Sequence, residues 1–258
     1  GGVPVIIDTC AQDRFKLTPE KLAAAITPRT KLLVLAYPNN PTGAVMTRDD
    51  LEKIAEVLRP TNIAVLSDEI YAELTFGFKH TSIASLPGMR ERTILASGFS
   101  KAYAMTGWRL GYVCAPAEIS DQILKLHQYA IMCAPTTSQL AAVEAMKNGD
   151  ADIEYMAEQY NFRRRYIYRG LADIGIDSFE PEGAFYVFPS IKETGLTSME
   201  FCRRLLQEQK VAVIPGDAFG SCGEGYIRCS YAYSKDVIKK CLEKIAAFVA
   251  QFDLDLNA

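Results

Sequence analysis

The chain has 258 residues, of which 49% are hydrophobic and 23% charged, and its formal net charge is −3. This composition is typical of a folded globular protein, and the length allows one large domain or two modest ones. The absence of a basic surplus argues against a nucleic-acid-binding protein. No apolar run reaches membrane-spanning length and no secretion signal is visible, so we expect neither a membrane nor a nucleic-acid partner.

Seven cysteines and two histidines are spread along the chain, and no two cysteines form a CxxC pair. The odd number and the spacing favour free thiols in a reduced, cytoplasmic protein. Without a Cys/His cluster we expect no metal site. Cys114 and Cys229 lie in apolar runs, where we expect them to be buried as small hydrophobic residues.

The first half of the chain alternates short apolar runs with helical patterns. Thr18-Pro19 is typical of a helix start, and Thr47 with Asp50 three residues later predicts a capping box for the next helix. The β-rich runs are residues 3–7, 31–36, 63–67, 93–97 and 111–115. Continuous apolar strands between helices predict an α/β fold, a mainly parallel sheet covered by helices on both faces.

The second half changes in pattern. Helices are predicted at residues 117–130 and 137–147, followed by a longer helix that ends at Gly175. Beyond it, strands at 184–188, 211–214 and 225–231 are separated by helices at 198–209 and 234–252. We therefore predict a large domain over residues 1–165 and a smaller C-terminal α+β domain over residues 166–258, with the boundary inside the long helix.

Three polar side chains follow predicted strands: Asn40, Asp68 and Lys101. The carboxyl ends of parallel strands meet at one edge of a sheet, so these residues are expected to converge on one pocket. Taken singly, each has an ordinary alternative, because a lysine is usually solvated, an aspartate caps helices and an Asn-Pro pair forms turns.

The lysine stretch carries the most specific pattern of the chain. Residues 97–112 read SGFSKAYAMTGWRLGY: Gly98 lies three residues before Lys101, Ser100 directly precedes it, and Arg109 follows eight residues later, ahead of Leu110 and Gly111. This spacing resembles the cofactor-lysine signature of the class I/II aminotransferases, enzymes of fold type I that depend on pyridoxal 5'-phosphate (PLP). The resemblance extends over nearly the whole chain.

The resemblance implies roles for residues of this stretch. Lys101 would form the Schiff base with PLP and later shuttle protons. Arg109 would hold the cofactor phosphate, a role that suits a fixed and permanently charged guanidinium fork. Ser97 and Ser100 would add hydroxyl donors to the phosphate.

Two further segments resemble elements of the same family. Residues 67–71, SDEIY, match its Asp-x-x-Tyr element, in which Asp68 would keep the ring nitrogen protonated and Tyr71 would donate to the phenolic oxygen. We expect the carboxylate to be buried, and the three-residue offset to place both side chains on one side of a helical turn. The NPTG element at residues 40–43 implies that Asn40 contacts the phenolic oxygen too, and a cis bond at Asn40–Pro41 is compatible with the sequence.

Arg228 lies in a predicted strand, GYIRCS, at residues 225–230. Alternation along a strand places Tyr226, Arg228 and Ser230 on one face, and Ile227 and Cys229 on the other. The segment resembles the small-domain strand whose arginine binds the substrate α-carboxylate, so Asn40 and Arg228 are the expected substrate-binding residues.

The resemblance implies a PLP-dependent aminotransferase that moves an amino group between an amino acid and a 2-oxo acid. The lysine stretch does not separate this activity from that of related C–S lyases and β-eliminases, or from a non-catalytic PLP-binding regulatory domain. Family members are homodimers with a long N-terminal segment ahead of the part that aligns with Gly1. That segment supplies a phosphate loop and a ring-stacking aromatic, so we expect the 258 residues alone to associate and to bind PLP poorly.

Overall fold

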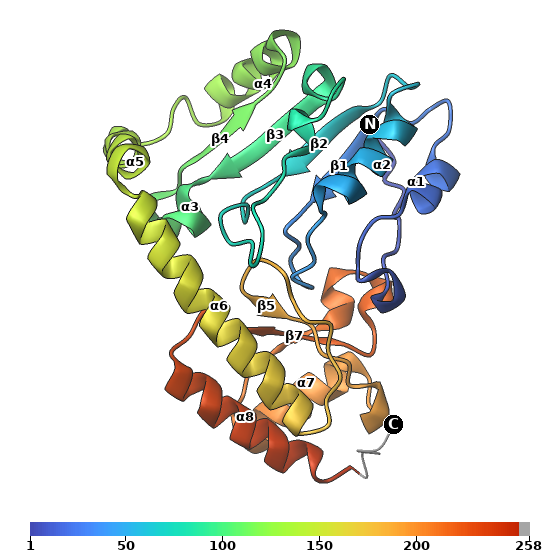
Figure 1. The fold of residues 1–258 in the computed structure, drawn as a ribbon, viewed down its shortest axis with the longest axis vertical. Coiled ribbons are helices and arrows are strands. Elements are labelled where there is room, and N and C mark those ends of the chain that lie inside the picture. The colour runs from blue at the N-terminus through green and yellow to red at the C-terminus, as the bar shows by residue number, and fades with distance from the viewer. Residues whose placement is uncertain (253–258) are drawn as a thin grey trace. The chain divides into compact units, whose positions relative to one another are not determined.

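The computed structural model describes residues 1–252, which form two compact units (Figure 1). The first unit contains Gly1–Ile7, Lys16–Pro38 and Val45–Ala157. The second contains Asp8–Phe15, Asn39–Ala44 and the chain from Glu158 onward. The first unit ends at Ala157, inside helix α6 (Asp150–Asp173). The domain boundary predicted near residue 165 lies in the same helix and stays a prediction.

The first unit is built on a four-stranded sheet in the order β1-β2-β3-β4. Strands β1 (Leu32–Ala36), β2 (Ala64–Asp68) and β3 (Thr93–Gly98) are parallel, and β4 (Gly111–Cys114) pairs antiparallel with β3. The predicted α/β fold class with a mainly parallel sheet is thereby confirmed. The carboxyl ends of the three parallel strands lie at one edge of the sheet, where Asp68 and the segment leading to Lys101 are found.

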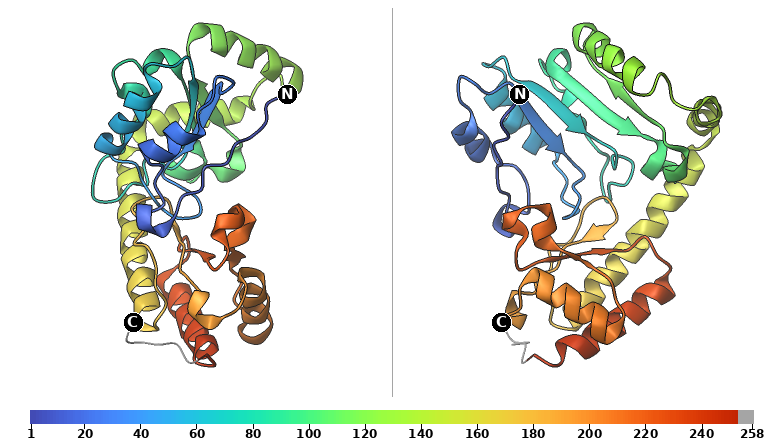
Figure 2. Two further views of the ribbon diagram at one scale, coloured as in Figure 1. Left: turned by 90° about the vertical axis from the view of Figure 1, so that its right-hand side faces the viewer. Right: turned by 180° about the vertical axis from the view of Figure 1, so that it is seen from behind.

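One face of this sheet carries the hydrophobic core of the first unit. Leu33, Leu35 and Val65 are buried together with Ile54 and Leu58, apolar residues of α2 (Arg48–Leu58), and α1 (Pro19–Ala25) packs against α2. On the opposite face Leu32 and Val34 are 45% and 60% exposed. The view from behind in Figure 2 shows this face of the strands without a helix in front of it. The prediction that residues 31–36 form a continuously buried strand is therefore wrong for alternate residues.

Two more expectations from the sequence are wrong. Residues 3–7 form no strand, because they pair with no strand among residues 1–252, and Val3 and Ile6 are 88% and 77% exposed. Cys114 was expected to be buried but is exposed, as are the other residues of β4. Cys229 is buried, as predicted.

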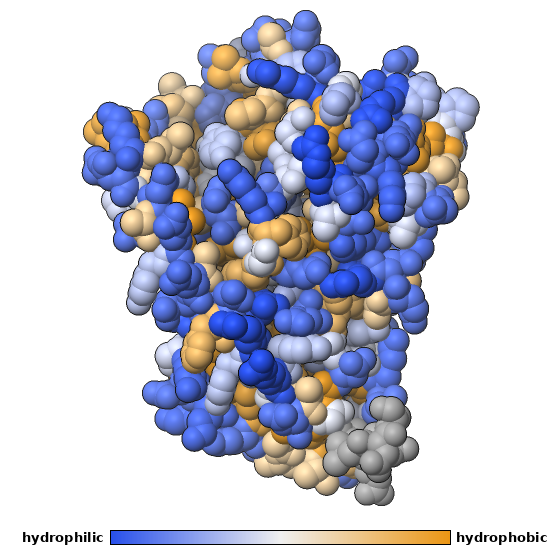
Figure 3. All heavy atoms as spheres, viewed as in Figure 1, coloured by the Kyte–Doolittle hydropathy of each residue, from blue (hydrophilic) through white to orange (hydrophobic). Residues whose placement is uncertain are grey.

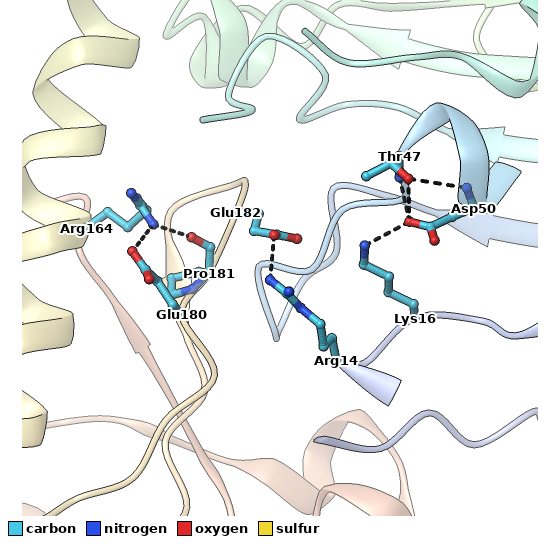
Figure 4. Close-up of polar contacts among 8 residues, drawn as sticks. All are labelled: Arg14, Lys16, Thr47, Asp50, Arg164, Glu180, Pro181 and Glu182. Carbon is cyan, nitrogen blue, oxygen red and sulfur yellow. Dashed lines mark hydrogen bonds and ion pairs between the residues drawn. The ribbon is translucent and has the colours of Figure 1, made fainter. Parts of the chain in front are cut away.

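The predicted capping box begins α2. The Thr47 hydroxyl accepts from the Asp50 amide at 3.2 Å, and the Asp50 carboxylate accepts from the Thr47 amide at 2.9 Å. Lys16 Nζ donates to the same carboxylate oxygen at 2.8 Å (Figure 4). This arrangement satisfies two donors at the helix start and fixes the chain between β1 and α2.

Replacing Asp50 with asparagine is expected to lower the free energy of unfolding at neutral pH by about 0.5–1 kcal/mol. Burial raises the pKa of Asp50, but hydrogen bonds from Lys16 and Thr47 outweigh it and hold the pKa below its usual value. A carboxyl group with a lowered folded-state pKa stabilises above its unfolded pKa of about 4, and this contribution disappears as the pH falls through the folded-state value. Urea unfolding near pH 7 and near pH 2.5 measures the difference.

The control for this prediction is Asp49→Asn, which removes the same charge from the same helical turn at an exposed position. It should leave the unfolding free energy within about 0.5 kcal/mol of the parent at both pH values. An equal destabilisation by Asp50→Asn at both pH values would show that the ionised carboxylate contributes nothing.

The rest of the first unit is helical. After β3 come α3 (Phe99–Ala102) and, beyond β4, α4 (Ala117–Ala130) and α5 (Thr136–Asn148). Several large apolar side chains of α5 are exposed, among them Leu140 at 67% and Met146 at 65%. Figure 3 shows such residues at the surface over α5, near the left edge of the view. An apolar surface of this kind is typical of an interaction site.

The second unit has a three-stranded antiparallel sheet in the order β5-β7-β6. Its strands are β5 (Tyr186–Val187), β6 (Ile214–Pro215) and β7 (Ile227–Ser230), each shorter than predicted, and its helices α7 (Ser198–Gln209) and α8 (Lys235–Val249) match the predicted ones. Figure 1 shows α8 beside the C-terminal half of α6. A Cβ atom on Gly170 of α6 would lie 2.4 Å from Leu242, so glycine permits this close approach.

Short 3₁₀ segments complete both units. They are η1 (Ala11–Asp13), η2 (Ile83–Ser85), η3 (Arg90–Arg92), η4 (Thr106–Trp108), η5 (Lys192–Thr194), η6 (Gly216–Phe219) and η7 (Ser221–Gly223). Two of them matter for the site. Segment η4 directly precedes Arg109, and η6 contains Phe219, whose ring contacts Arg228.

Candidate active site

Lys101 lies at the carboxyl edge of the first unit's sheet. Strand β3 ends at Gly98 and the chain turns directly into α3, so the lysine that follows the strand lies in a short helical turn. The buried side chains of Phe99 and Ala102 anchor this turn, and the Phe99 amide donates to the Leu110 carbonyl at 3.3 Å. A rigid support of this kind fixes the direction of the lysine side chain.

Tyr71 is a predicted partner that lies close to Lys101. The lysine Nζ lies over the tyrosine ring, 5.7 Å from its centroid, and the tyrosine is only 6% exposed. An ammonium group above an aromatic face is stabilised by the ring quadrupole. The structure therefore brings together the amine and one of the two residues predicted to act beside it.

Asp68 is the last residue of β2 and its side chain is exposed, contrary to the predicted buried carboxylate. Its Oδ1 accepts from the Ile70 amide at 3.1 Å. Because β2 continues through Asp68, the expected common helical turn with Tyr71 does not form, and Tyr71 is buried while Asp68 is not. Asp68 and Lys101 nevertheless follow neighbouring parallel strands, in which Asp68 pairs with Ala96.

The predicted phosphate-binding residues are linked through Thr106. Its hydroxyl donates to the Ser100 carbonyl at 2.9 Å, and its own carbonyl accepts from Arg109 Nη1 at 3.0 Å. Arg109 has a left-handed backbone, with φ of 53°, just after η4. Ser97 Oγ instead donates to the Glu69 carbonyl at 3.3 Å. Ser100 and Arg109 thus share one loop, while Ser97 connects β3 to the segment after β2.

Glu69, a residue not expected from the sequence to act in the site, has a carboxylate with several hydrogen-bond partners. It is 4% exposed, and its carboxylate accepts from Ser67 Oγ at 2.9 Å and Ser82 Oγ at 2.7 Å, with His80 Nε2 at 2.9 Å. The signal that could have revealed it is alternation, because Glu69 lies two residues after Ser67 and on the same side of an extended chain, and a charge buried there needs partners.

A cavity of about 270 Å³ opens on the Glu69 side of β2 and β3. His80, Ser82 and Ser97 contribute to its lining, whereas Asp68 and Lys101 do not. The cavity is thus separate from the lysine and borders the carboxylate network instead.

In the second unit, Asn40 and Arg228 are directly bonded. Arg228 Nη1 donates to Asn40 Oδ1 at 2.7 Å, and the guanidinium carbon lies over the rings of Tyr186 and Phe219, 4.4 and 4.8 Å from their centroids. Ile227 is buried and Arg228 is partly exposed, as the predicted alternation requires. Two rings and one amide fix the plane of the guanidinium and leave its remaining N–H groups free to bind an anion.

The loop that carries Asn40 is held by many local contacts. Asn39 accepts from the Thr42 hydroxyl at 2.8 Å, and the Asn40–Pro41 bond is cis, which the sequence allows. Gly43, with φ of +74°, has no room for a side chain, because a Cβ atom would lie 2.4 Å from Pro181. The convergence of Asn40 with Asp68 and Lys101 stays a prediction, because Asn40 belongs to the second unit.

The segment around Pro181 is fastened by ion pairs within the second unit. Arg164 Nη1 donates to Glu180 and to the Pro181 carbonyl, each at 2.8 Å, and Arg14 Nη2 pairs with Glu182 at 2.7 Å (Figure 4). The Gly43 carbonyl accepts from the amide of Glu182 at 2.8 Å. These contacts hold the Asn40 loop against the segment that leads to β5.

The side chains at the sheet edge fit PLP in kind. Lys101 offers an amine for an aldehyde, Arg109 and Ser100 share one loop as donors suited to a phosphate, and Asp68 offers an exposed carboxylate for a ring nitrogen. Each group comes from the carboxyl edge of the sheet or the loop beside it, where open α/β sheets bind ligands.

Comparisons with known proteins agree with this chemistry. Residues 1–245 match the family model of aminotransferase class I and II. The chain is 50% identical to a putative aminotransferase, YugH, of Bacillus subtilis (strain 168), and 43% identical to an aspartate aminotransferase of Pyrococcus abyssi. These alignments cover 96% and 95% of the chain but 64% of each relative, so the chain spans a little under two thirds of their length.

The fold is shared with solved aminotransferases. An aromatic aminotransferase from Pyrococcus horikoshii OT3 superposes with a TM-score of 0.95 at 42% identity, over 97% of this chain and 68% of that protein. An aspartate aminotransferase from Thermus thermophilus superposes with a TM-score of 0.91 at 37% identity, over 96% of this chain and 64% of that protein. The chain belongs to the class I and II aminotransferase family.

Proposed function

We propose that the protein is a PLP-dependent aminotransferase that transfers the amino group of an amino acid to a 2-oxo acid. The observation that carries the proposal is Lys101, which lies over Tyr71 at the carboxyl edge of the sheet, in a stretch that resembles the family's lysine signature. Relatives named as aspartate and aromatic aminotransferases support amino-group transfer. They do not agree on one substrate, so the proposal names the class alone.

Each predicted residue has a role that its chemistry supports. PLP, when bound, supplies an aldehyde and an electron-accepting ring. Lys101 is the amine that anchors the aldehyde and the base that moves a proton at the substrate Cα. Asp68 holds a proton at the ring nitrogen, while Tyr71 and Asn40 donate to the phenolic oxygen.

Anions bind at two further positions. Ser97, Ser100 and Arg109 bind the phosphate, which needs several donors and a fixed positive charge. In the second unit Arg228 binds the substrate α-carboxylate. Asn40 supports the guanidinium of Arg228 by accepting a hydrogen bond from its Nη1 at 2.7 Å.

Replacing Arg228 with alanine is expected to raise the KM of every α-amino acid alike. A charge-assisted contact to a carboxylate contributes about 1.5–3 kcal/mol, which corresponds to roughly ten- to a hundredfold in KM. Steady-state kinetics on acidic, aromatic and aliphatic amino acids measure the change. Arg203→Ala, an exposed arginine of α7 in the same unit, is the control. A loss confined to one substrate would contradict the role and indicate a side-chain contact.

The half-reactions of the holoenzyme test the proposed activity. Transfer predicts that an amino acid yields one equivalent of its 2-oxo acid and leaves pyridoxamine phosphate, which a second 2-oxo acid returns to PLP. Release of ammonia with pyruvate from a β-substituted amino acid, without pyridoxamine phosphate, would instead show a lyase. PLP binding without either product would show a regulatory domain.

We also propose a cytoplasmic homodimer organised as a large and a small domain. The exposed apolar side chains of α5 support association, because large apolar surfaces are usually covered by a partner. Among residues 1–252, no helix is long and apolar enough to cross a membrane.

A further inference from the structure

We propose that Glu69 is a positioning residue for Asp68. Its carboxylate, fixed by hydrogen bonds beneath the sheet edge, holds the end of β2 so that the neighbouring aspartate is directed to the opposite side. This inference rests on the proposed function, in which Asp68 holds the proton of the cofactor's ring nitrogen.

The first support is the placement of the two carboxylates. Side chains alternate along a strand, so Ser67 and Glu69 lie on one side of β2 and its continuation, and Asp68 lies on the other. Burial follows this alternation, because Ser67 and Glu69 are 6% and 4% exposed and Asp68 is exposed. A rotation of residue 69 about the strand axis would therefore turn Asp68 away from its direction.

The second support is that residue 69 is bonded through its backbone as well as its side chain. Its amide donates to the Ala96 carbonyl at 2.8 Å, and its carbonyl accepts from the Ala72 amide at 2.9 Å and the Ser97 hydroxyl at 3.3 Å. It thus ties the end of β2 to the end of β3 and to the turn that carries Tyr71. Asp68 precedes this anchored residue directly, and its Oδ1 accepts a single hydrogen bond within residues 1–252, from the Ile70 amide.

The third support is the electrostatic state of the network. Burial raises the pKa of Glu69, but hydrogen bonds from His80, Ser82 and Ser67 outweigh it and hold the pKa below its usual value. The side chain is therefore ionised at neutral pH and accepts from all three donors. A buried carboxylate with three donors occupies a single orientation, because leaving any of these groups unpaired is costly.

Glu69→Gln is the variant that tests the proposal. The amide keeps the size but cannot accept from all three donors, since its NH₂ group faces one of them. We expect kcat of the holoenzyme to fall about tenfold to a hundredfold, because small misplacements of reacting groups cost that much, while the KM for the amino acid changes less than about twofold. The control is Glu52→Gln, which replaces a half-exposed carboxylate paired with Arg59 in the same unit. It should change neither kcat nor KM.

A spectroscopic signal reports on Asp68 without turnover. With PLP labelled with ¹⁵N in its ring, the ¹⁵N chemical shift of the bound cofactor measures how far the ring nitrogen is protonated. Glu69→Gln should move this shift toward the unprotonated value, in the same direction as Asp68→Ala and by a smaller amount. Ser82→Ala keeps the Glu69 carboxylate and two of its donors, so it should move the ¹⁵N shift by less than Glu69→Gln does. This second variant keeps the test valid if Glu69→Gln does not fold.

A double-mutant cycle separates positioning from a general loss of structure. If Glu69 acts through Asp68, adding Glu69→Gln to Asp68→Ala should reduce kcat by less than about twofold. A full second loss, or an unchanged ¹⁵N shift in Glu69→Gln and Ser82→Ala, would overturn the inference alone. If Asp68→Ala itself kept its turnover, the proposed role of Asp68 would fail, and this inference with it, whereas a parent holoenzyme without transamination would overturn the proposed function.

Discussion

Lys101→Ala should abolish transamination by the holoenzyme, with kcat lower by at least about 10³-fold. The variant loses the amine that anchors the cofactor aldehyde and the base that moves the proton, and a positioned base alone contributes about 10²–10⁴-fold. We expect no other lysine to replace it, because α3 places the Lys101 amine above the Tyr71 ring. Single-turnover measurements with a saturating amino acid give the rate of the chemical step.

Two comparisons complete this experiment. Lys53→Ala, on an exposed position of α2 in the same unit, should keep full activity. Exogenous methylamine should restore part of the activity of Lys101→Ala, because a free amine can take over the proton transfer. Turnover of Lys101→Ala near that of the parent protein would show that another residue carries the chemistry.

Asp68→Ala should reduce turnover far more than it reduces PLP content. The phosphate donors and Lys101 still retain the cofactor, whereas the ring nitrogen loses the carboxylate that keeps it protonated. Losing one such electrostatic contact at a reacting centre costs roughly a hundredfold or more in kcat. Measuring kcat together with bound PLP, determined after release in alkali, separates the two effects.

The matched variant is Asp49→Ala, which removes an exposed carboxylate from α2 of the same unit. It should leave both kcat and PLP content near those of the parent protein. An Asp68→Ala protein that lost PLP in proportion to its activity would contradict the proposed role, since Asp68 would then be an anchor of the cofactor.

Helix starts and buried strands were predictable from the sequence, because they depend on residues that are close together in the chain. Thr47 and Asp50 form the expected capping box, and the apolar runs of β1, β2 and β3 became parallel strands within one or two residues of their predicted bounds. Helix starts and buried strands depend on neighbouring residues, so the sequence carries them directly. The alternation around Arg228 was predictable for the same reason.

The remaining features depend on partners that are distant in sequence. An apolar run such as residues 3–7 becomes a strand only beside another strand, and the exposure of Cys114 depends on what covers β4. The Glu69 network joins Ser67 of β2 to His80 and Ser82, which lie in the loop before η2 more than ten residues later, and no spacing rule links the two segments. The rings on Arg228 likewise come from β5 and η6, which only the folded second unit brings together.

The central claim is that Lys101 is the residue that binds PLP covalently. Reducing the holoenzyme with sodium borohydride fixes the cofactor to its lysine, and mass spectrometry of the digested protein then locates it. We predict one phosphopyridoxyl group per chain, on Lys101, in the peptide that contains Ser97 and Ser100. A label on a different lysine, or no label in a protein that has bound PLP, would contradict the account.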